Sequence, residues 1–226
     1  MENFNNHLPV KIRFGEGISQ TLPAVVKEVS SSHAFLMVDE GIEKFNPAAA
    51  DLINKLKNDG SFKVTVFEKP AGEPTIQMVD DATSALKSSG ADSVIALGGG
   101  SVIDTAKAAR LCAQLNTSFR EFTSKAPVYP EPTIPLVARK AGIANGYLRA
   151  QIALVDPVLT YSMPPTMTAN VGIDALAQAI AGIIAKCSTP IGDAIGYEAV
   201  RIMTPALVAA YKNGADKEAR AGMSAG

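Results

Sequence analysis

The chain has 226 residues, of which 47% are hydrophobic and 19% charged, a composition that excludes a disordered protein and allows one or two hydrophobic cores. Lys and Arg number 21 against 22 for Asp and Glu, and the two signs alternate without long runs, which excludes a basic surface for nucleic acid or an anionic membrane. The N-terminus has no apolar core behind a basic start, and no stretch approaches the roughly 20 apolar residues of a membrane span, so we expect no membrane partner. The two cysteines, Cys112 and Cys187, do not make a disulfide framework, so we expect a cytoplasmic protein.

Three short apolar runs rich in β-branched residues predict strands in the first part of the chain. The runs are AFLMV (34–38), KVTVF (63–67) and SVIAL (93–97). Each is followed by a longer segment of helical period, and the segments Pro47–Leu56 and Thr75–Leu86 each carry an apolar stripe. Gly60 and Gly90 are the residues at which these two helices are expected to end.

The order of strand, helix and strand indicates a parallel sheet, because such units connect right-handedly and bury both faces of the sheet. A further strand is expected at Ile134–Ala138, and the proline-rich stretch Pro127–Pro135, which precedes and overlaps its start, cannot be helical. We therefore expect residues 1–165 to form an α/β domain with a doubly wound parallel sheet, the class that binds dinucleotides.

The character of the chain changes after Asp156-Pro157. From Thr168 onward it is dominated by Ala, Ile, Gly and Val at helical spacing. This predicts one helix or more at Ala169–Ala185 and another at Ile191–Tyr211, the latter bent or interrupted at Pro205. Residues 166–226 are therefore expected to be the start of an all-helical domain. Its helices are too apolar to stand alone and need further helices or another subunit, so we expect a homo-oligomer.

A glycine cluster precedes the helix expected at Val102–Leu111. The residues Gly98–Gly100 let the backbone approach a ligand closely, and the N-terminus of a helix attracts a pyrophosphate. Ser101 and Asp104 have the spacing of a capping box, in which the hydroxyl and the carboxylate each accept from a backbone amide. The cluster is either a tight turn before a capped helix or a cofactor-binding loop, and the strand-to-helix context favours the loop.

Asp39 lies at the carboxyl end of the first predicted strand. A dinucleotide-binding fold places there the acid that accepts hydrogen bonds from a ribose hydroxyl, and its charge repels a 2′-phosphate, which favours NAD over NADP. The sequence Asp-Glu-Gly is equally a common turn, so both interpretations stay open from position alone.

Asp174 and Gln178 are four residues apart and share a face of a predicted helix, where two oxygens can point at one site. An Asp near a helix start is more commonly a cap or a partner of the helix dipole, which is the favoured interpretation from the residues alone. The only histidines are His7 and His33, and neither has a partner at ligand spacing, so no histidine cluster for a transition metal is expected.

Four phrases, in the correct order, resemble the iron-containing alcohol dehydrogenase family. They are RFGEGI (13–18), GGGSVIDTAK (98–107), ALVDPVLTYSMPP (153–165) and TANVGIDALAQAI (168–180). The resemblance implies that the second phrase binds the NAD pyrophosphate through Gly98, Gly99, Gly100, Ser101 and Asp104. It also implies that Asp39 selects the adenosine ribose, that Lys140 and Leu159 line the cofactor cleft, and that Asp174 descends from a metal ligand.

The chain departs from the family pattern at its metal site and before Lys140. Gln178 stands where the family has a histidine ligand, and Ala181 stands where it has a glutamate; a carboxamide is a poorer ligand for iron or zinc than imidazole. The resemblance places the family's two further histidine ligands in the helical domain beyond residue 226, so at most two of four ligands are expected here. A divalent metal is expected to be weakly held or absent. The family's Thr-Thr-x-Gly-Thr-Gly-Ser-Glu insert has no counterpart here, where Ala138, Arg139 and Lys140 are simply joined. This leaves open a shortened chain, a natural remnant or a sequence from which segments have been left out.

Three hypotheses follow. The leading one is an NAD-dependent oxidoreductase that interconverts a small primary alcohol and its aldehyde by hydride transfer with a divalent metal. The alternative is a catalytically impaired fragment or remnant that binds the nucleotide without turnover. The third is an interaction protein whose apolar helices after Thr168 dock on a partner. No residue is identified as a catalytic acid or base.

Overall fold

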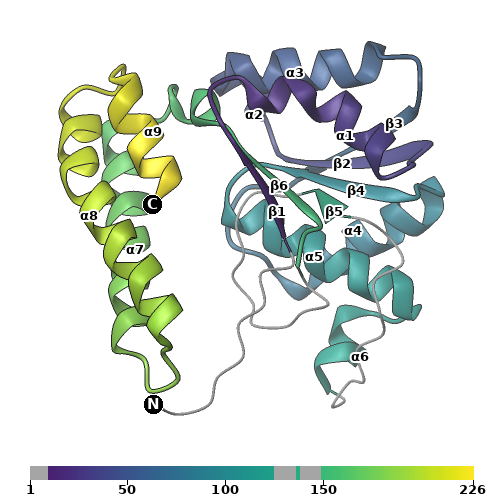
Figure 1. Ribbon diagram of the computed structural model, residues 1–226. Helices are drawn as coiled ribbons and strands as arrows, with labels where there is room; N and C mark the ends of the chain where they lie inside the picture. The colour runs from purple at the N-terminus through teal and green to yellow at the C-terminus, as the bar shows by residue number, and fades with distance from the viewer. Residues whose placement is uncertain (1–9, 125–135, 138–148) are drawn as a thin grey trace. The chain divides into compact units, whose positions relative to one another are not determined.

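The computed structural model describes residues 10–124, 136–137 and 149–226, and these residues belong to two compact units (Figure 1). One unit contains Ser19–Leu154 together with residues 10–13, and the other contains Phe14–Ile18 and Val155–Gly226. The expected domain boundary after residue 165 stays a prediction.

The sheet unit is built on parallel strands. Their bounds are β1 (Lys11–Phe14), β2 (His33–Asp39), β3 (Lys63–Lys69), β4 (Ser93–Leu97), β5 (Leu136–Val137) and β6 (Ile152–Val155). The strand order is β1-β6-β5-β4-β2-β3, and β2 pairs in parallel with both β3 and β4, as β5 does with β4 and β6. The α/β class with a doubly wound parallel sheet is therefore confirmed. Strands β1 and β6 are additional to those predicted.

Helices connect these strands and cover the sheet. They are α1 (Leu22–Glu28), α2 (Ile42–Phe45), α3 (Pro47–Asn58), α4 (Ile76–Ser89), α5 (Gly100–Leu115) and α6 (Phe119–Ser124), with a 3₁₀ turn η1 at Ile18–Thr21. Helix α3 lies on one face of the strands, and α4 and α5 lie on the other (Figure 1). The side chain of Thr75 caps α4 by accepting from the amide of Met78, and Gly90 ends that helix with a φ of 66°.

The core of the sheet unit lies between strands β2 and β4 and helices α4 and α5. The apolar residues that alternate along the two strands point into it, and they pack on the stripes of the two helices: Phe35, Met37, Val94, Ala96, Ala82, Leu86, Val102, Ile103, Ala106 and Ala109. The ring of Phe35 stacks on that of Phe67, with centroids 5.7 Å apart. This burial fixes the carboxyl ends of β2 and β4 side by side.

The second unit consists of helices after a 3₁₀ turn. They are η3 (Pro157–Thr160), α7 (Pro165–Ile184), α8 (Pro190–Lys212) and α9 (Lys217–Ala225). The helical character expected for this part of the chain is confirmed, and α8 runs through Pro205 without interruption. Arg220 of α9 is buried and donates to the hydroxyl of Thr168 on α7 at 2.8 Å and to the carbonyl of Met163 at 2.9 Å, which ties α9 to the start of α7.

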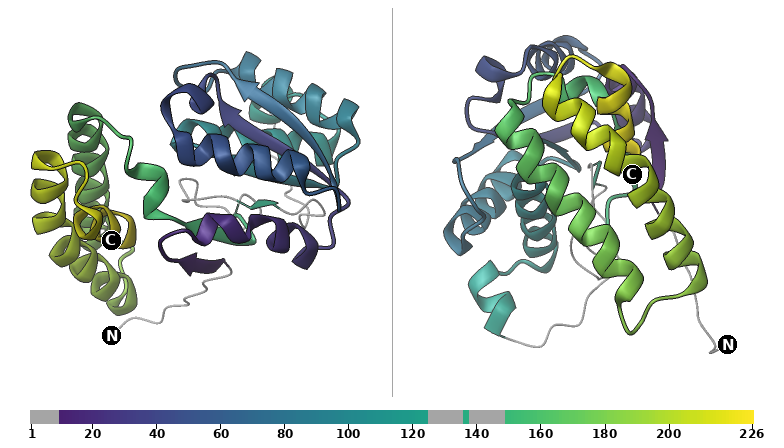
Figure 2. Two further views of the ribbon diagram at one scale, coloured as in Figure 1. Left: turned by 90° about the horizontal axis from the view of Figure 1, so that it is seen from above. Right: turned by 90° about the vertical axis from the view of Figure 1, so that its left-hand side faces the viewer.

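Helices α7 and α8 are the two long helices of this unit (Figure 2). Both leave large apolar side chains exposed. Ile173 and Ile184 of α7 are 61% and 76% exposed, and Tyr197 of α8 is 64% exposed. Among the described residues, α7 is long and apolar enough to cross a membrane, and only 11% of its most apolar part is buried. The expectation that no stretch approaches such a span was therefore wrong, because Ala, Gly and Ile together reach the required apolarity. One such helix is by itself weak evidence of a membrane segment.

Candidate cofactor-binding site

The carboxyl ends of β2 and β4 lie at the point where the direction of winding reverses. Strand β2 connects through α3 to β3 on one side, and β4 connects through α5 to β5 on the other, while β2 and β4 themselves are neighbours. Ligands of open α/β sheets bind outside the carboxyl ends of the strands at such a point. Asp39 is the last residue of β2, and the glycine cluster follows β4 directly.

The backbone of the glycine cluster lies open. Gly99 is the N-cap of α5, with φ −77° and ψ −174°, and no side chain caps the helix. A Cβ atom built on Gly99 or on Gly100 meets no heavy atom within 4 Å. Helix α5 is 16 residues long, so the amides of its first turn and its dipole together favour an anion at this end.

Gly98 brings the cluster and Asp39 together. A Cβ atom at Gly98 would lie 2.7 Å from Cγ2 of Val102 and 3.0 Å from Oδ2 of Asp39. Real Cβ contacts are longer than this, so only glycine lets the carboxylate and the first turn of α5 approach so closely. The glycine cluster and Asp39, which are nearly 60 residues apart in the sequence, therefore share one site.

The carboxylate of Asp39 is partly exposed and has an ammonium neighbour. Its side chain is 36% exposed, and its Oδ1 lies 3.9 Å from Nζ of Lys69, whose side chain is 0% exposed. A separation of 3.9 Å is too long for a hydrogen bond, so the carboxylate oxygens keep their capacity to accept from a ligand. Lys69 was not predicted from the sequence, because a lysine at a strand end gives no signal that it will be buried.

The capping box predicted for Ser101 and Asp104 was wrong. The helix begins at Gly100, so Ser101 lies inside α5 and its carbonyl accepts from the hydroxyl of Thr105 at 2.7 Å. Asp104 accepts instead from Nζ of Lys107 at 3.2 Å. The physical reason is that Gly99 takes the extended N-cap conformation two residues earlier, which leaves Ser101 with helical geometry.

Lys140 and Leu159 are the two remaining residues that the resemblance places at the cofactor. Lys140 lies outside the described residues. Leu159 is half-buried in η3 of the helical unit, where the carboxylate of Asp156 caps the turn by accepting from the amide of Val158 at 3.0 Å. Its contact with a cofactor stays a prediction.

The predicted metal ligands share a face of α7, as their spacing indicated. Nε2 of Gln178 donates to Oδ2 of Asp174 at 2.8 Å, and both residues are exposed. The amide therefore turns its donor toward the carboxylate, and one carboxylate with one carboxamide does not make the nitrogen-rich set that iron or zinc prefers. Within residues 10–124, 136–137 and 149–226, no group of three or more His, Cys, Asp or Glu side chains is placed to hold a metal. His33 is buried and hydrogen-bonded to Thr65 at 2.8 Å.

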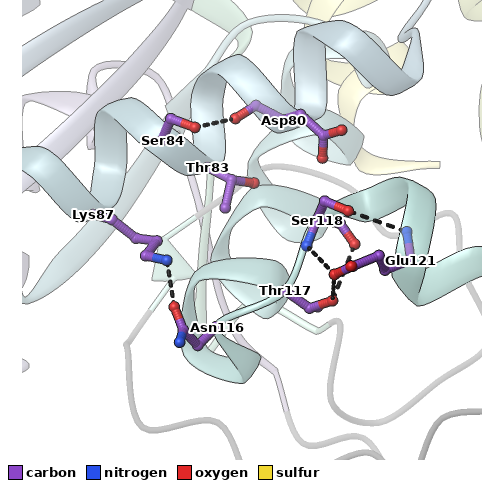
Figure 3. A pocket seen from close by; sticks show the side chains of 8 residues that line it. All are labelled: Asp80, Thr83, Ser84, Lys87, Asn116, Thr117, Ser118 and Glu121. Carbon is purple, nitrogen blue, oxygen red and sulfur yellow. Dashed lines mark hydrogen bonds between the residues drawn. The ribbon is translucent and has the colours of Figure 1, made fainter.

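A separate polar hollow of about 270 Å³ lies between α4 and the start of α6 (Figure 3). Its polar groups bond to one another: Lys87 donates to Asn116, Thr117 to Glu121 at 3.0 Å, and the amide of Phe119 to Asp80 at 2.5 Å. Asn116 follows the carboxyl end of α5, about 24 Å along that helix from the glycine cluster. We assign it no part in the cofactor site.

Comparison with known proteins identifies the family. The model of the iron-containing alcohol dehydrogenases matches residues 9–146, more than half of the chain. A choline dehydrogenase of Bacillus subtilis (strain 168) is 31% identical over 250 residues, which cover 99% of this chain and 62% of that protein. Long-chain-alcohol dehydrogenase 1 of Geobacillus thermodenitrificans (strain NG80-2) is 29% identical, with 94% and 59% covered. This chain thus spans about three fifths of the length of these relatives.

Solved structures agree with the sequence matches. Sulfoacetaldehyde reductase from Bifidobacterium kashiwanohense, solved in complex with NAD⁺, superposes with a TM-score of 0.88 at 26% identity, covering 99% of this chain and 65% of that one. The 250-residue alignment with the Bacillus protein is longer than this chain, so that relative has internal residues that this chain lacks. The family match, the doubly wound sheet and the glycine cluster after β4 together show that the chain belongs to the iron-containing alcohol dehydrogenase family.

Proposed function

We propose that this chain is the NAD(H)-binding part of an oxidoreductase that interconverts a small primary alcohol and its aldehyde. The observation that carries the proposal is the meeting of an open glycine backbone and the Asp39 carboxylate at one switch point of the sheet. The amides at the start of α5 bind the pyrophosphate, and Asp39 accepts hydrogen bonds from the adenosine ribose. The NAD⁺ bound to the Bifidobacterium relative supports this choice of cofactor.

The charge of Asp39 gives the site its cofactor preference. A carboxylate at the ribose repels the 2′-phosphate of NADP, so we propose NAD as the natural cofactor. When bound, NAD supplies the acceptor of the hydride at its nicotinamide ring. The residues described here bind and orient the adenosine and pyrophosphate portion, and we assign none of them as a catalytic acid or base.

The residues present do not fit a complete divalent metal site, because Gln178 replaces an imidazole and its amide donates to Asp174. We therefore derive no step of the reaction through iron or zinc. This same observation favours the second candidate function, a catalytically impaired member of the family that binds NAD(H) without turnover. Both candidates share the glycine site and differ only in chemistry.

Two measurements test the proposal in sequence. A titration of the purified chain followed by NADH fluorescence should show saturable binding, and a flat titration would remove the basis for both candidates. Oxidation of small primary alcohols is then assayed with added ferrous or zinc ion. Turnover that rises with the metal supports the oxidoreductase, and NADH binding without turnover supports the impaired form.

We also propose that the protein is a homo-oligomer, because the helical unit exposes large apolar side chains such as Ile173, Ile184 and Tyr197. Light scattering after size-exclusion chromatography measures the mass directly. A clean monomer of 23.6 kDa would contradict this proposal and the interaction-protein hypothesis alike.

The cytoplasmic location and the lack of nucleic-acid and membrane partners stay predictions.

A further inference from the structure

The end of β3 carries a buried ammonium group beside Asp39. Nζ of Lys69 donates to the carbonyl oxygens of Pro70 at 2.6 Å and Gly72 at 2.8 Å, and its side chain is 0% exposed. The sheet register places Lys69 directly opposite Asp39, and the amide of Glu40 donates to the Lys69 carbonyl at 2.9 Å. One side chain therefore connects the end of β2 with the loop of residues 70–75 that leads into α4.

The ammonium group of Lys69 is hydrogen-bonded to carbonyl oxygens of the protein and is not exposed to solvent. A buried cation is costly unless its N–H groups find acceptors, and the two carbonyl oxygens satisfy two of the three. Gly72 has a φ of 104°, a conformation that side-chain-bearing residues rarely adopt, and this turn brings its carbonyl oxygen to the ammonium. The loop is thus shaped around Lys69.

The third interaction of the ammonium is with Asp39. At 3.9 Å the two charges attract without a hydrogen bond, so Lys69 orients the carboxylate while leaving its oxygens able to accept from another group. On its other side the carboxylate lies against Gly98, where a Cβ atom would come within 3.0 Å of Oδ2. Residues at the ends of both neighbouring strands therefore restrict the position of the Asp39 carboxylate, and its side chain stays 36% exposed.

We propose that Lys69 is a positioning residue, which holds the Asp39 carboxylate in the orientation that accepts a hydrogen bond from the 2′-hydroxyl of the adenosine ribose. Through the same side chain, the conformation of the 70–75 loop is coupled to that hydrogen bond. The inference rests on the proposed function, because it needs Asp39 to bind the ribose. Because its side chain is 0% exposed, Lys69 offers no surface to a dinucleotide, so its effect on binding passes through Asp39.

The test compares NADH with its analogue lacking the 2′-hydroxyl of the adenosine ribose, by fluorescence titration of the full chain. The variant Lys69→Met keeps an unbranched side chain of similar length and leaves no unpaired buried charge. We expect the Kd for NADH to rise roughly tenfold, since a hydrogen bond to a charged group is weakened, while the Kd for the deoxy analogue changes less than about twofold. Lys63→Met, at the exposed opposite end of the same strand, is the matched control and should leave both Kd values unchanged.

A double-mutant cycle separates positioning from a general structural role. In an Asp39→Asn background, Lys69→Met should change the Kd for NADH less than about twofold, because the group through which it acts is already altered. If Lys69→Met raises the Kd for NADH and the Kd for the deoxy analogue equally, or raises neither, the inference is overturned, while the proposed binding of NADH to the unmodified chain still stands. Failure of the unmodified chain to bind NADH would instead defeat the proposed function.

A second measurement serves if Lys69→Met does not fold. Amide hydrogen exchange in residues 70–75 should slow when NADH is added to the unmodified chain, because the loop is tied to the ribose contact through Lys69. The Asp39→Asn variant keeps the lysine and breaks the link from the other side, so NADH should protect the loop much less. Equal protection in both proteins would contradict the coupling.

Discussion

The substitution Gly99→Val separates the effect of the open backbone at the start of α5 on NADH binding from any effect on the stability of the fold. Gly99 has a φ of −77°, which any residue adopts, and a Cβ atom there meets no heavy atom within 4 Å. The only loss expected in the free protein is the preference of the N-cap position for glycine over valine, about 1 kcal/mol. For a chain of this size that corresponds to a fall in Tm of roughly 2–4 °C.

The effect on binding should be much larger. The two methyl groups of valine occupy the space from which the backbone amides are proposed to reach the pyrophosphate. Loss of two charge-assisted hydrogen bonds, at about 1.5–3 kcal/mol each, amounts to at least about 3 kcal/mol. This corresponds to a rise of more than about 100-fold in the Kd for NADH.

Fluorescence titration with NADH measures the Kd, and thermal unfolding followed by circular dichroism measures the Tm of the same samples. Gly182→Val is the matched control, because Gly182 also has nothing within 4 Å of a built Cβ atom but lies on α7 in the other unit. An unchanged Kd for NADH in a folded Gly99→Val protein would refute the assignment of the glycine cluster to the pyrophosphate.

Other perturbations test other parts of the molecule. Asp39→Gly should narrow the preference for NADH over NADPH, because the carboxylate that repels the 2′-phosphate is removed; equal Kd ratios before and after would refute the ribose contact. Burial opposes ionisation of Asp92, but hydrogen bonds from the hydroxyls of Ser31 and Ser32 and from the amides of Ser32 and His33 together outweigh it and lower its pKa from 3.8 to about 2. Its stabilisation is therefore complete above pH 3.8 and lost as the pH falls toward 2, so Asp92→Asn should cost on the order of 1 kcal/mol in urea unfolding at pH 7, after allowance for solvent screening, and progressively less below pH 4. Burial raises the pKa of the Cys112 thiol to about 12, whereas Cys187 is exposed, so iodoacetamide at pH 8 should label Cys187 alone, as peptide mass spectrometry can verify.

The buried part of the sheet could be predicted because its signal is local. The runs that form β2, β3 and β4 are rich in β-branched and apolar residues, and each strand in the structure contains its predicted run. Strand β1 escaped prediction because its residues Lys11–Phe14 alternate with charges and are mostly exposed, so they lack an apolar run. Strand β6 has only four residues, too few for its period to stand out.

The site was only partly predictable, for a different reason. Gly98 and Asp39 were identified from their positions after strands, and the structure brings them together. The capping box failed because residue types at the correct spacing do not fix where a helix begins, and the extended conformation of Gly99 decided it. The burial of Lys69 depends on carbonyl groups of a loop and on a neighbouring strand, and no pattern along the chain encodes that arrangement.

The close approach of α7 and α8 at Gly172 limits where this protein can be engineered. A Cβ atom there would come within 2.3 Å of Cδ1 of Leu207, so a larger side chain at residue 172 requires either the buried side chain of Leu207 or the helices themselves to move. Ten residues further along the same helix, Gly182 has empty space around it, and alanine at that position gains helix propensity of about 1 kcal/mol at no steric cost. Efforts to obtain a more robust version of this protein for biochemical work should begin at the second glycine and leave the first untouched.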